Sequence, residues 1–399
     1  MTQSKGTIGI LTGGGDVPGL NPAIRAVTIR AAREGYRVLG LRRGWAGLVD
    51  VVPDRAADNS PYVEELTEAV VNRAGRTGGT FLHTSRTRPS HLPRPLVPPH
   101  LQEKYTDEIN DITPDVLKNL EFLGIDILIP IGGDDTLSYA HRLHEEGVKV
   151  VAIPKTMDND VPGTDYCVGF STCITRTIEL THTLRTTAGS HERFLVIEVF
   201  GRYAGYTVML PTMAGAADRC LIPESPFDPD HLARILVEDR NRHTSRYAVV
   251  LASEGARMIG DDDMSYTGSE TDQYGHRRLG GIGDRVAMRL KDISPQFNRG
   301  QRVNVVSQRL GYLVRCGDPD ALDSVVPMAF GNLAMDLILS GRTGRLVNVA
   351  HGVFGNAPIE VVSGHKKNVD VARHYNPDRL RPRYTTFEGQ PLFIMTGYL

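Results

Sequence analysis

The sequence is poor in cysteine, tryptophan and uncompensated charge, and each shortage excludes a class of protein. Its four cysteines include no CxxC pair, and no His/Cys group has the spacing of a zinc site. Four thiols in 399 residues do not suggest a disulfide scaffold, so we expect a reducing cytoplasm. The 45 basic and 47 acidic side chains leave a net charge of −2, and the single tryptophan belongs to no aromatic, basic patch. Nucleic-acid binding is therefore not expected.

Long hydrophobic runs are missing as well. No continuous apolar stretch approaches 18 residues, and the first apolar run is too short for a signal peptide, so we expect no membrane segment. Glycine, by contrast, is abundant, with 41 copies in 399 residues against an average of about 7%. These glycines have no collagen-like period and cluster at a few turns, so the positions of those turns carry the information.

Glycine-rich turns repeatedly follow apolar strands. The run at residues 7–11 ends in TGGGD, and a helix follows with Asn21 as its N-cap, Pro22 in its first turn and Gly35 at its end. Continuous apolar strands that alternate with helices indicate parallel sheets covered on both faces. We therefore predict an α/β protein with two similar three-layer, Rossmann-like lobes. Further strands are expected within 126–135, 149–155, 193–202 and 247–255, and further helices over 136–146 and 319–340.

Two segments lack this pattern. Residues 87–104 are rich in proline and basic side chains, and we expect an exposed loop or lid there. Residues 257–275 are polar and acidic, which is typical of a surface excursion.

The glycine turns carry candidate chemistry, because ligands of parallel sheets bind at the carboxyl ends of strands. The turn at 12–21, TGGGDVPGLN, offers backbone N–H groups and a helix N-terminus to an anion, although a purely structural turn explains it equally well. The turn GGDDT presents two carboxylates, of which Asp134 is a candidate for the Mg²⁺ side. Helix capping is the alternative for these residues, although it explains one aspartate more readily than both.

The segment PKTMDND gathers a hydroxyl and two carboxylates. In an extended backbone Thr156, Asp158 and Asp160 share one face, whereas Lys155 faces the other way unless the backbone turns. A carboxylate placed there can accept a proton from a substrate hydroxyl. A solvated acidic turn is the equally weighted alternative.

Four arginines stand near glycines or at strand ends: Arg86, Arg193, Arg202 and Arg315. Guanidinium groups suit phosphoryl oxygens, although a single arginine is usually a surface residue. Taken together, the turns, carboxylates, lysine and arginines favour phosphoryl transfer between two anionic ligands. Neither a GxxxxGK[ST] loop nor an HRD/DFG pair is present, so the two commonest phosphotransferase designs are excluded.

In this order, TGGGDVPGLN, GGTFLHTSR, PIGGDD, PKTMDND, EVFGRYAGY, SEGA and LGYLVRCG resemble the motifs of the 6-phosphofructokinase family over about residues 7–345. The resemblance implies an active site in the cleft between two lobes, fructose 6-phosphate as acceptor and Mg²⁺ as cofactor. It also implies a donor lobe of residues 1–169 plus about 314–364, and a sugar-phosphate lobe of 170–313 plus about 365–399. A homodimer or homotetramer in the cytoplasm would follow, with neither nucleic acid nor membrane as partner.

The same resemblance assigns roles to individual residues. Asp158 matches the base for the sugar 1-hydroxyl, with Thr156 and Asp160 as its neighbours, and Arg202 matches the arginine beside the transferred phosphoryl group. Arg193 matches an arginine that reaches the 6-phosphate from a neighbouring subunit. The donor-phosphate positions are Gly14 and Arg86, the Mg²⁺ position is Asp134, and the sugar-phosphate positions are Phe200, Gly201, Glu254, Tyr312 and Arg315.

Two residues decide the expected donor. ATP-using members of the family have glycine where this chain has Asp135, and glycine where it has Lys155. Asp135 places a bulky anion where an ATP α-phosphate would lie, and Lys155 supplies a cation for inorganic pyrophosphate. The pair resembles the pyrophosphate-dependent branch, whose reaction is expected to run in both directions. An ATP-dependent enzyme and a non-catalytic sugar-phosphate-binding paralogue remain the alternatives.

Some positions depart from the ATP-type pattern. Tyr312 stands in place of histidine and Phe200 in place of methionine. The second inter-subunit arginine has no match near Val306, and Arg302 and Arg309 are possible substitutes. The 87–104 insertion and the tail after about residue 365 have no counterpart.

Overall fold

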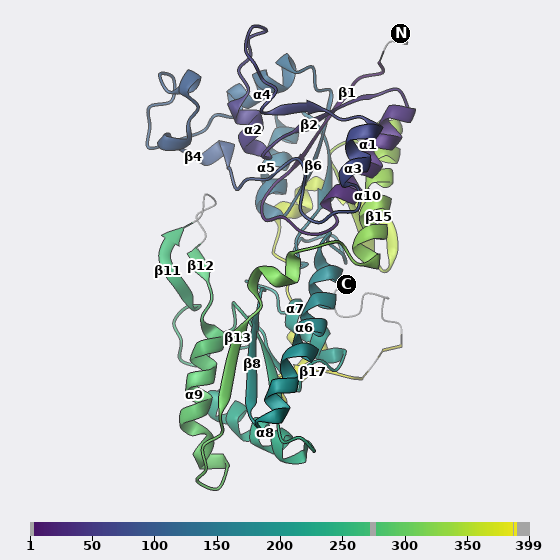
Figure 1. Cartoon of the computed structure of the whole chain (residues 1–399). Helices are drawn as coiled ribbons and strands as arrows, with labels where there is room; N and C mark the ends of the chain where they lie inside the picture. The colour runs from purple at the N-terminus through teal and green to yellow at the C-terminus, as the bar shows by residue number, and fades with distance from the viewer. Residues whose placement is uncertain (1–3, 272–276, 386, 389–399) are drawn as a thin grey trace.

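The computed structural model describes residues 4–271, 277–385 and 387–388, and it contains two α/β lobes, one above the other in Figure 1. The upper lobe is built on a seven-stranded sheet in the order β15-β14-β7-β6-β1-β2-β3. Its five inner strands are parallel, and β3 and β15 pair antiparallel at the edges. In that order, the strands are Val353–Pro358, Arg345–Ala350, Lys149–Pro154, Ile127–Gly132, Thr7–Thr12, Arg37–Leu41 and Val63–Glu65.

The lower lobe has a smaller, four-stranded parallel sheet in the order β13-β8-β10-β9. Its strands are Val305–Arg309, Phe194–Val199, Ala248–Ser253 and Arg219–Leu221. The predicted α/β class with two lobes is confirmed, but the lobes differ in strand number and in their edges. Both sheets are strongly apolar: β6, β8 and β10 are buried along their whole length.

Helices cover both faces of each sheet. Alternate strand residues point to opposite faces, and because these residues are apolar on both faces, both must be covered. On the upper sheet, Ile8 and Ile10 join one core with α1, whereas Leu11 joins another with α2 and α5. On the lower sheet, α6 and α7 pack on one face and α8 and α9 on the other. These helices span Leu20–Arg33 (α1), Trp45–Asp50 (α2), Asp134–Glu145 (α5), Phe170–Ser190 (α6), Tyr206–Met213 (α7), Pro229–Arg242 (α8) and Ile282–Phe297 (α9).

One helix, α10 (Ala321–Leu339), returns from the lower lobe to pack against α1. Within the part of the chain that the structure describes, it alone is long and apolar enough, by length and composition, to cross a membrane. Asp323, Ser324, Asn332 and Asp336 interrupt its apolar residues, so no continuous apolar run in it approaches 18 residues, but the mean hydropathy over an 18-residue window reaches 1.4. Half of that window is buried inside the protein, and Phe330, Ala334 and Leu337 are fully buried, which explains its composition as that of a core helix.

The start of α1 differs from the prediction. The helix begins at Leu20, and Gly19 rather than Asn21 is its N-cap, with φ at +107°. Asn21 is buried instead, donating to the carbonyls of Thr77 and Gly78 and accepting from the N–H of Phe81. A side chain with both donors and an acceptor can fix a neighbouring loop, and that use prevails here over capping.

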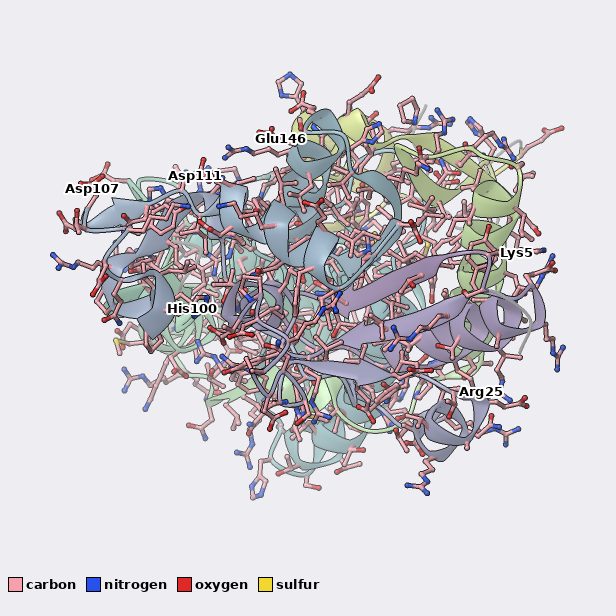
Figure 2. The ribbon with its side chains drawn as sticks, turned by 90° about the horizontal axis from the view of Figure 1, so that it is seen from above. Lys5, Arg25, His100, Asp107, Asp111 and Glu146 are labelled. Carbon is pink, nitrogen blue, oxygen red and sulfur yellow. The ribbon has the colours of Figure 1, made fainter. Side chains whose placement is uncertain are left out.

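The proline-rich segment is not simply an exposed loop. It contains the 3₁₀ turns η1 (Pro89–His91) and η3 (Pro99–Leu101), and β4 (Leu92–Pro93) pairs with β5 (Ile109–Asn110). Leu92, Val97 and Leu101 are buried in the core that α2 and α5 share. Seen from above, Asp107 and Asp111 lie on the outer rim of this lobe (Figure 2).

The acidic segment is also ordered in part. β11 (Tyr266–Thr271) and β12 (Arg277–Leu279) form an antiparallel pair, and residues 272–275 of the predicted excursion lie outside the described residues.

Asp323, at the start of α10, ties the two lobes together. It is fully buried and accepts four hydrogen bonds of 2.6–2.7 Å: from the Tyr166 hydroxyl, the Gly169 N–H, and both the N–H and the hydroxyl of Thr172. The Gly169 and Thr172 N–H groups belong to the N-terminus of α6, where helix donors lack intrahelical partners. One carboxylate thus joins α10 to the first turn of the helix that opens the lower lobe.

We predict that Asp323→Ala lowers the free energy of unfolding by about 3–5 kcal/mol, because buried donors lose their acceptor. Asp336→Ala is the matched control on the same helix, since its exposed ion pair with Arg30 is worth at most about 1 kcal/mol. Urea denaturation of both variants measures the difference. Equal losses in the two variants would contradict the role given to Asp323.

Candidate active site

A cavity of about 470 Å³ opens where the glycine turns of the two lobes meet. It lies beyond the carboxyl ends of β1, β6, β7 and β8, as expected for ligand sites in parallel sheets. All predicted site residues line it except Arg193 and Gly201. The members that it brings together are Gly14, Arg86, Asp134, Asp135, Lys155, Thr156, Asp158, Asp160, Phe200, Arg202, Glu254, Tyr312 and Arg315.

One wall of the cavity concentrates positive charge around the first glycine turn. The Lys155 side chain is buried, with the residue 4% exposed, and its ammonium donates to the Gly15 carbonyl at 2.7 Å. Burial, together with the charges of Arg315 and Arg86, lowers the pKa of Lys155 to about 8, and the charges of Asp16 and Asp134 oppose this shift. Gly14 has φ at +80°, and a Cβ on it would lie 3.1 Å from the ammonium. The turn therefore needs glycine both for its backbone and for the approach of Lys155.

Arg315 lies on this donor side, although the resemblance groups it with the sugar phosphate. Its guanidinium packs so closely on Gly15 that a Cβ there would collide with it. It pairs with Asp16 at 3.5 Å and stacks 4.6 Å from the Tyr312 ring centroid. Tyr312 makes an edge contact with Phe200. Arg315 therefore connects the donor turn with the aromatic side of the cavity.

The opposite wall carries carboxylates, beginning with the head of α5. Asp134 and Asp135 are the first two residues of this helix, and its N-cap is Gly133, so the capping alternative is wrong. The Asp134 carboxylate accepts from the Asp135 N–H at 3.0 Å and pairs with Lys366 at 3.0 Å. Both aspartates face the cavity.

The PKTMDND segment reaches the cavity through a turn and not through an extended strand. β7 ends at Pro154, and Asn159 has φ at +56°. The Asn159 side chain donates to the Asp165 carbonyl and accepts from the Cys167 N–H, which fixes the turn. Thr156, Asp158 and Asp160 line the same cavity, but the extended backbone from which their grouping was predicted is not what brings them together. The turn also brings Lys155 to the same cavity.

Asp158 has the surroundings of a general base. Its Oδ2 accepts from the Arg202 N–H at 3.2 Å, whereas its buried Oδ1 has no hydrogen-bond partner among the described residues. Burial raises the pKa of Asp158, while Arg202 and Lys366 oppose the rise. Burial and the charge of Asp158 raise the pKa of Asp160 to about 7 and that of Glu254 to about 8. Carboxylates with raised pKa values in one cleft indicate acid–base chemistry.

Gly201 shapes the lower wall without lining it. Its φ is +140°, and a Cβ would collide with the Ser253 hydroxyl. Its carbonyl accepts from that hydroxyl at 2.9 Å and from the Gly255 N–H at 3.1 Å. The resulting bend directs Phe200 and Arg202 into the cavity, and the Arg202 guanidinium donates to the Arg277 carbonyl in β12.

Arg193 lies outside the cavity of its own chain. It precedes β8, whereas Phe200 follows this strand, so they stand at opposite ends, roughly 20 Å apart. Arg309 lines the cavity instead and pairs with the buried Glu198 at 2.6 Å. Glu198 also accepts from the N–H groups at the start of α9. Arg302 pairs with Asp292 and does not line the cavity.

Two functional candidates were not found from the sequence. Asn159 positions the acidic turn, and its left-handed backbone gives no signal in the sequence pattern. Lys366 comes from the C-terminal segment, more than 200 residues after Asp134. Only the folded chain brings Lys366 and Asp134 together.

A Mg²⁺ ion fits this donor set if it arrives with phosphate. Among the described residues no group of three or more His, Cys, Asp or Glu side chains forms a protein-only cage. Mg²⁺ commonly uses one or two carboxylates plus substrate phosphates and waters. Asp134 on the cavity wall can supply the carboxylate. The Asp158 carboxylate, whose buried Oδ1 has no hydrogen-bond partner among the described residues, adds a second negative charge to the same cavity.

Comparison with known proteins agrees with this geometry. The family described as phosphofructokinase matches residues 7–338. A pyrophosphate–fructose 6-phosphate 1-phosphotransferase of Dictyoglomus thermophilum is 36% identical over 93% of this chain and 97% of its own length. An ATP-dependent 6-phosphofructokinase of Mycobacterium bovis is 35% identical over 92% and 97%. The pyrophosphate-dependent phosphofructokinase structure from Marinobacter aquaeolei shares the fold, with a TM-score of 0.70, 18% identity and coverage of 97% and 95%. This chain belongs to the phosphofructokinase family.

Proposed function

We propose that this protein transfers a phosphoryl group reversibly between pyrophosphate and the 1-hydroxyl of fructose 6-phosphate, with Mg²⁺ as cofactor and fructose 1,6-bisphosphate and phosphate as products. One observation carries the choice of donor: the buried Lys155 and Asp135, at the head of α5, line the same cavity. Overall similarity does not decide the donor, because relatives with pyrophosphate and ATP names are almost equally identical to this chain.

Lys155 favours a compact, highly charged donor. Its ammonium is buried near the guanidinium groups of Arg315 and Arg86 and forms no ion pair with a carboxylate among the described residues. The charges of Asp16 and Asp134 only partly offset the two arginines. A buried charge without a counter-ion costs several kcal/mol, and a phosphate oxygen at the Gly14 turn would remove that cost. Inorganic pyrophosphate brings the required charge density and needs no room for a nucleoside.

Asp135 disfavours a nucleotide. It stands at the head of α5 and faces the cavity. A carboxylate in the position expected for an α-phosphate repels that group and fills its space. Lys155 therefore attracts the small donor and Asp135 repels the larger one.

The chemistry needs a base, a charge clamp and near-attack positioning. Asp158 takes the proton of the attacking hydroxyl on its unpartnered Oδ1, an O–P bond forms to the sugar, and the O–P bond to the leaving phosphate breaks. Arg202 spreads its donors over the phosphoryl oxygens. Asp134 would hold Mg²⁺, which would supply charge neutralisation to the phosphate groups.

On the acceptor side, Phe200, Glu254 and Tyr312 line the sugar wall, and Gly201 shapes it through its backbone bend. We place the donor lobe at 1–169 plus about 314–364 and the sugar-phosphate lobe at 170–313 plus about 365–399. In a cytoplasmic homodimer or homotetramer, Arg193 of a neighbouring subunit would complete the 6-phosphate site. An ATP-dependent phosphofructokinase is the second candidate, because ATP-named relatives match almost as well.

The direct test is turnover of the purified enzyme with Mg-pyrophosphate and with Mg-ATP at equal fructose 6-phosphate. We expect kcat/KM for pyrophosphate to exceed that for ATP by at least about 100-fold, since one charge repulsion and one lost cation contact each contribute a few kcal/mol. A preference for ATP would reject the donor assignment but not the family. No turnover with either donor would favour the non-catalytic paralogue.

The pKa of Lys155 predicts a pH dependence. With a folded pKa of about 8, this lysine is a cation below that pH and becomes neutral as the pH rises through it. We therefore expect kcat/KM for pyrophosphate to fall about tenfold per pH unit above pH 8.

The matched variant is Lys155→Met. Its kcat/KM for pyrophosphate should be lower at every pH, and it should lack the part of the fall above pH 8 that comes from deprotonation of Lys155. Initial rates between pH 6.5 and 9.5 at constant free Mg²⁺ give both profiles, and the ionisation of pyrophosphate itself is common to the two. Parallel profiles would show that Lys155 is not the titrating cation.

A further inference from the structure

A lysine from the C-terminal segment reaches the carboxylate wall of the cavity. Lys366 lies between the 3₁₀ turn η5 (Ile359–Ser363) and the short helix α11 (Val371–His374). Its ammonium pairs with Asp134 at 3.0 Å and lies 4.0 Å from the centroid of the Tyr203 ring. The cation thus stands between the head of α5 in the upper lobe and the EVFGRY turn of the lower lobe.

The segment that carries this lysine is firmly held by the upper lobe. The neighbouring Lys367 is 2% exposed, and its ammonium donates to the carbonyls of Thr164 at 2.8 Å and Asp165 at 3.2 Å. The Lys367 N–H also donates to the Asp160 carbonyl at 3.2 Å. A buried lysine is retained only where its donors are satisfied, so Lys367 serves as the anchor of this segment.

The lower lobe holds the next residues. The Val369 N–H donates to the Glu224 carboxylate at 2.8 Å, and the Tyr206 hydroxyl donates to the Asn368 carbonyl at 2.6 Å. The backbone directly after residue 366 is therefore held by contacts with both lobes. The Lys366 side chain can change partner without movement of this main chain.

The distribution of charge in the cavity suggests a role for the Lys366 side chain besides its ion pair with Asp134. Lys155, Arg86 and Arg315 place their charge at the donor turn, whereas Asp134, Asp158 and Asp160 gather on the wall that Lys366 faces. A phosphoryl group that moves toward Asp158 leaves the cations of the donor turn and approaches carboxylates that repel it. Lys366 is a cation on that path.

The resting ion pair is easily opened. The side chains of Lys366 and Asp134 are 38% and 30% exposed, and such partly exposed pairs contribute at most about 1 kcal/mol. A phosphoryl oxygen offers the ammonium a stronger, charge-assisted partner.

We propose that Lys366 is a catalytic residue, whose ammonium exchanges Asp134 for the oxygens of the phosphoryl group in transfer. This inference rests on the proposed phosphoryl transfer in the same cavity. Lys366 stabilises the charge on the moving group, and Lys367 positions it by anchoring the segment.

The test compares Lys366→Met and Lys366→Arg with the wild type and with Lys104→Met. Lys104 forms an ion pair with Asp115, at an N–O distance of 2.5 Å, and neither residue lines the cavity. This control therefore also removes one lysine–aspartate pair. For each protein, kcat and KM are measured in the direction of fructose 6-phosphate phosphorylation. The affinity for Mg-imidodiphosphate, a non-transferring analogue of pyrophosphate, is measured by calorimetry, and thermal unfolding reports on the fold.

We expect Lys366→Met to lower kcat on the order of 100-fold and to weaken imidodiphosphate binding about tenfold, with an unchanged unfolding temperature. Lys366→Arg should restore most of the binding, and Lys104→Met should stay within twofold of wild type. Values of kcat and imidodiphosphate affinity within twofold of wild type in Lys366→Met would overturn the proposal.

Failure of the donor assignment gives a different result. If the wild type uses ATP and not pyrophosphate, the donor proposal is wrong, and the same variants are then assayed with ATP. A 100-fold loss of kcat with ATP in Lys366→Met would still support contact with the transferred group, whereas full activity with ATP would overturn it.

Discussion

A buried ammonium with no carboxylate partner in the part of the chain that the structure describes is the constraint on which the cavity depends. The Lys155 ammonium is held at the first glycine turn by its hydrogen bond to the Gly15 carbonyl, and two arginines stand close enough to lower its pKa. Such an arrangement is unfavourable in the empty protein and favourable once an anion is bound. The conformations of Gly14 and Gly15 follow from it, because side chains on these residues would crowd Lys155 and Arg315. Binding of an anionic donor thereby relieves the repulsion between Lys155 and the two arginines, which the folded chain brings together.

The second requirement is that two lobes meet with their strand ends facing each other. Asp323 joins α10 to the start of α6, and Asp158 of the upper lobe accepts from the Arg202 N–H of the lower lobe. The segment at 366–369 adds contacts to both lobes. Asp158, Arg202 and Lys366 are consequently held at fixed positions across the cleft. Such positioning matters for phosphoryl transfer, because its catalysis depends on placement and electrostatics more than on covalent intermediates.

Local pattern explains which parts were predictable from the sequence. The strands within 126–135, 149–155, 193–202 and 247–255 and the glycine turns were found because a buried parallel strand is a continuous apolar run that must end in a turn. Features set by long-range contacts were not found. Asn21 binds a loop that lies 56–60 residues away and so does not act as a cap. Leu92 and Leu101 of the 87–104 segment are buried by a core that forms only on folding. Lys366 had no signal, because a Lys-Lys pair in a polar tail is usually a solvated surface feature.

The central claim is that Asp135 and Lys155 together select the donor. Its most direct measurement is the ratio of kcat/KM for ATP to kcat/KM for pyrophosphate in Asp135→Gly, Lys155→Gly and the double variant. We expect the ratio to rise in each single variant, and the double variant to rise on the order of 100-fold or more, since removal of the repulsion and of the pyrophosphate cation act in the same direction. A double variant that folds, retains fructose 6-phosphate binding and shows the wild-type ratio would contradict the claim.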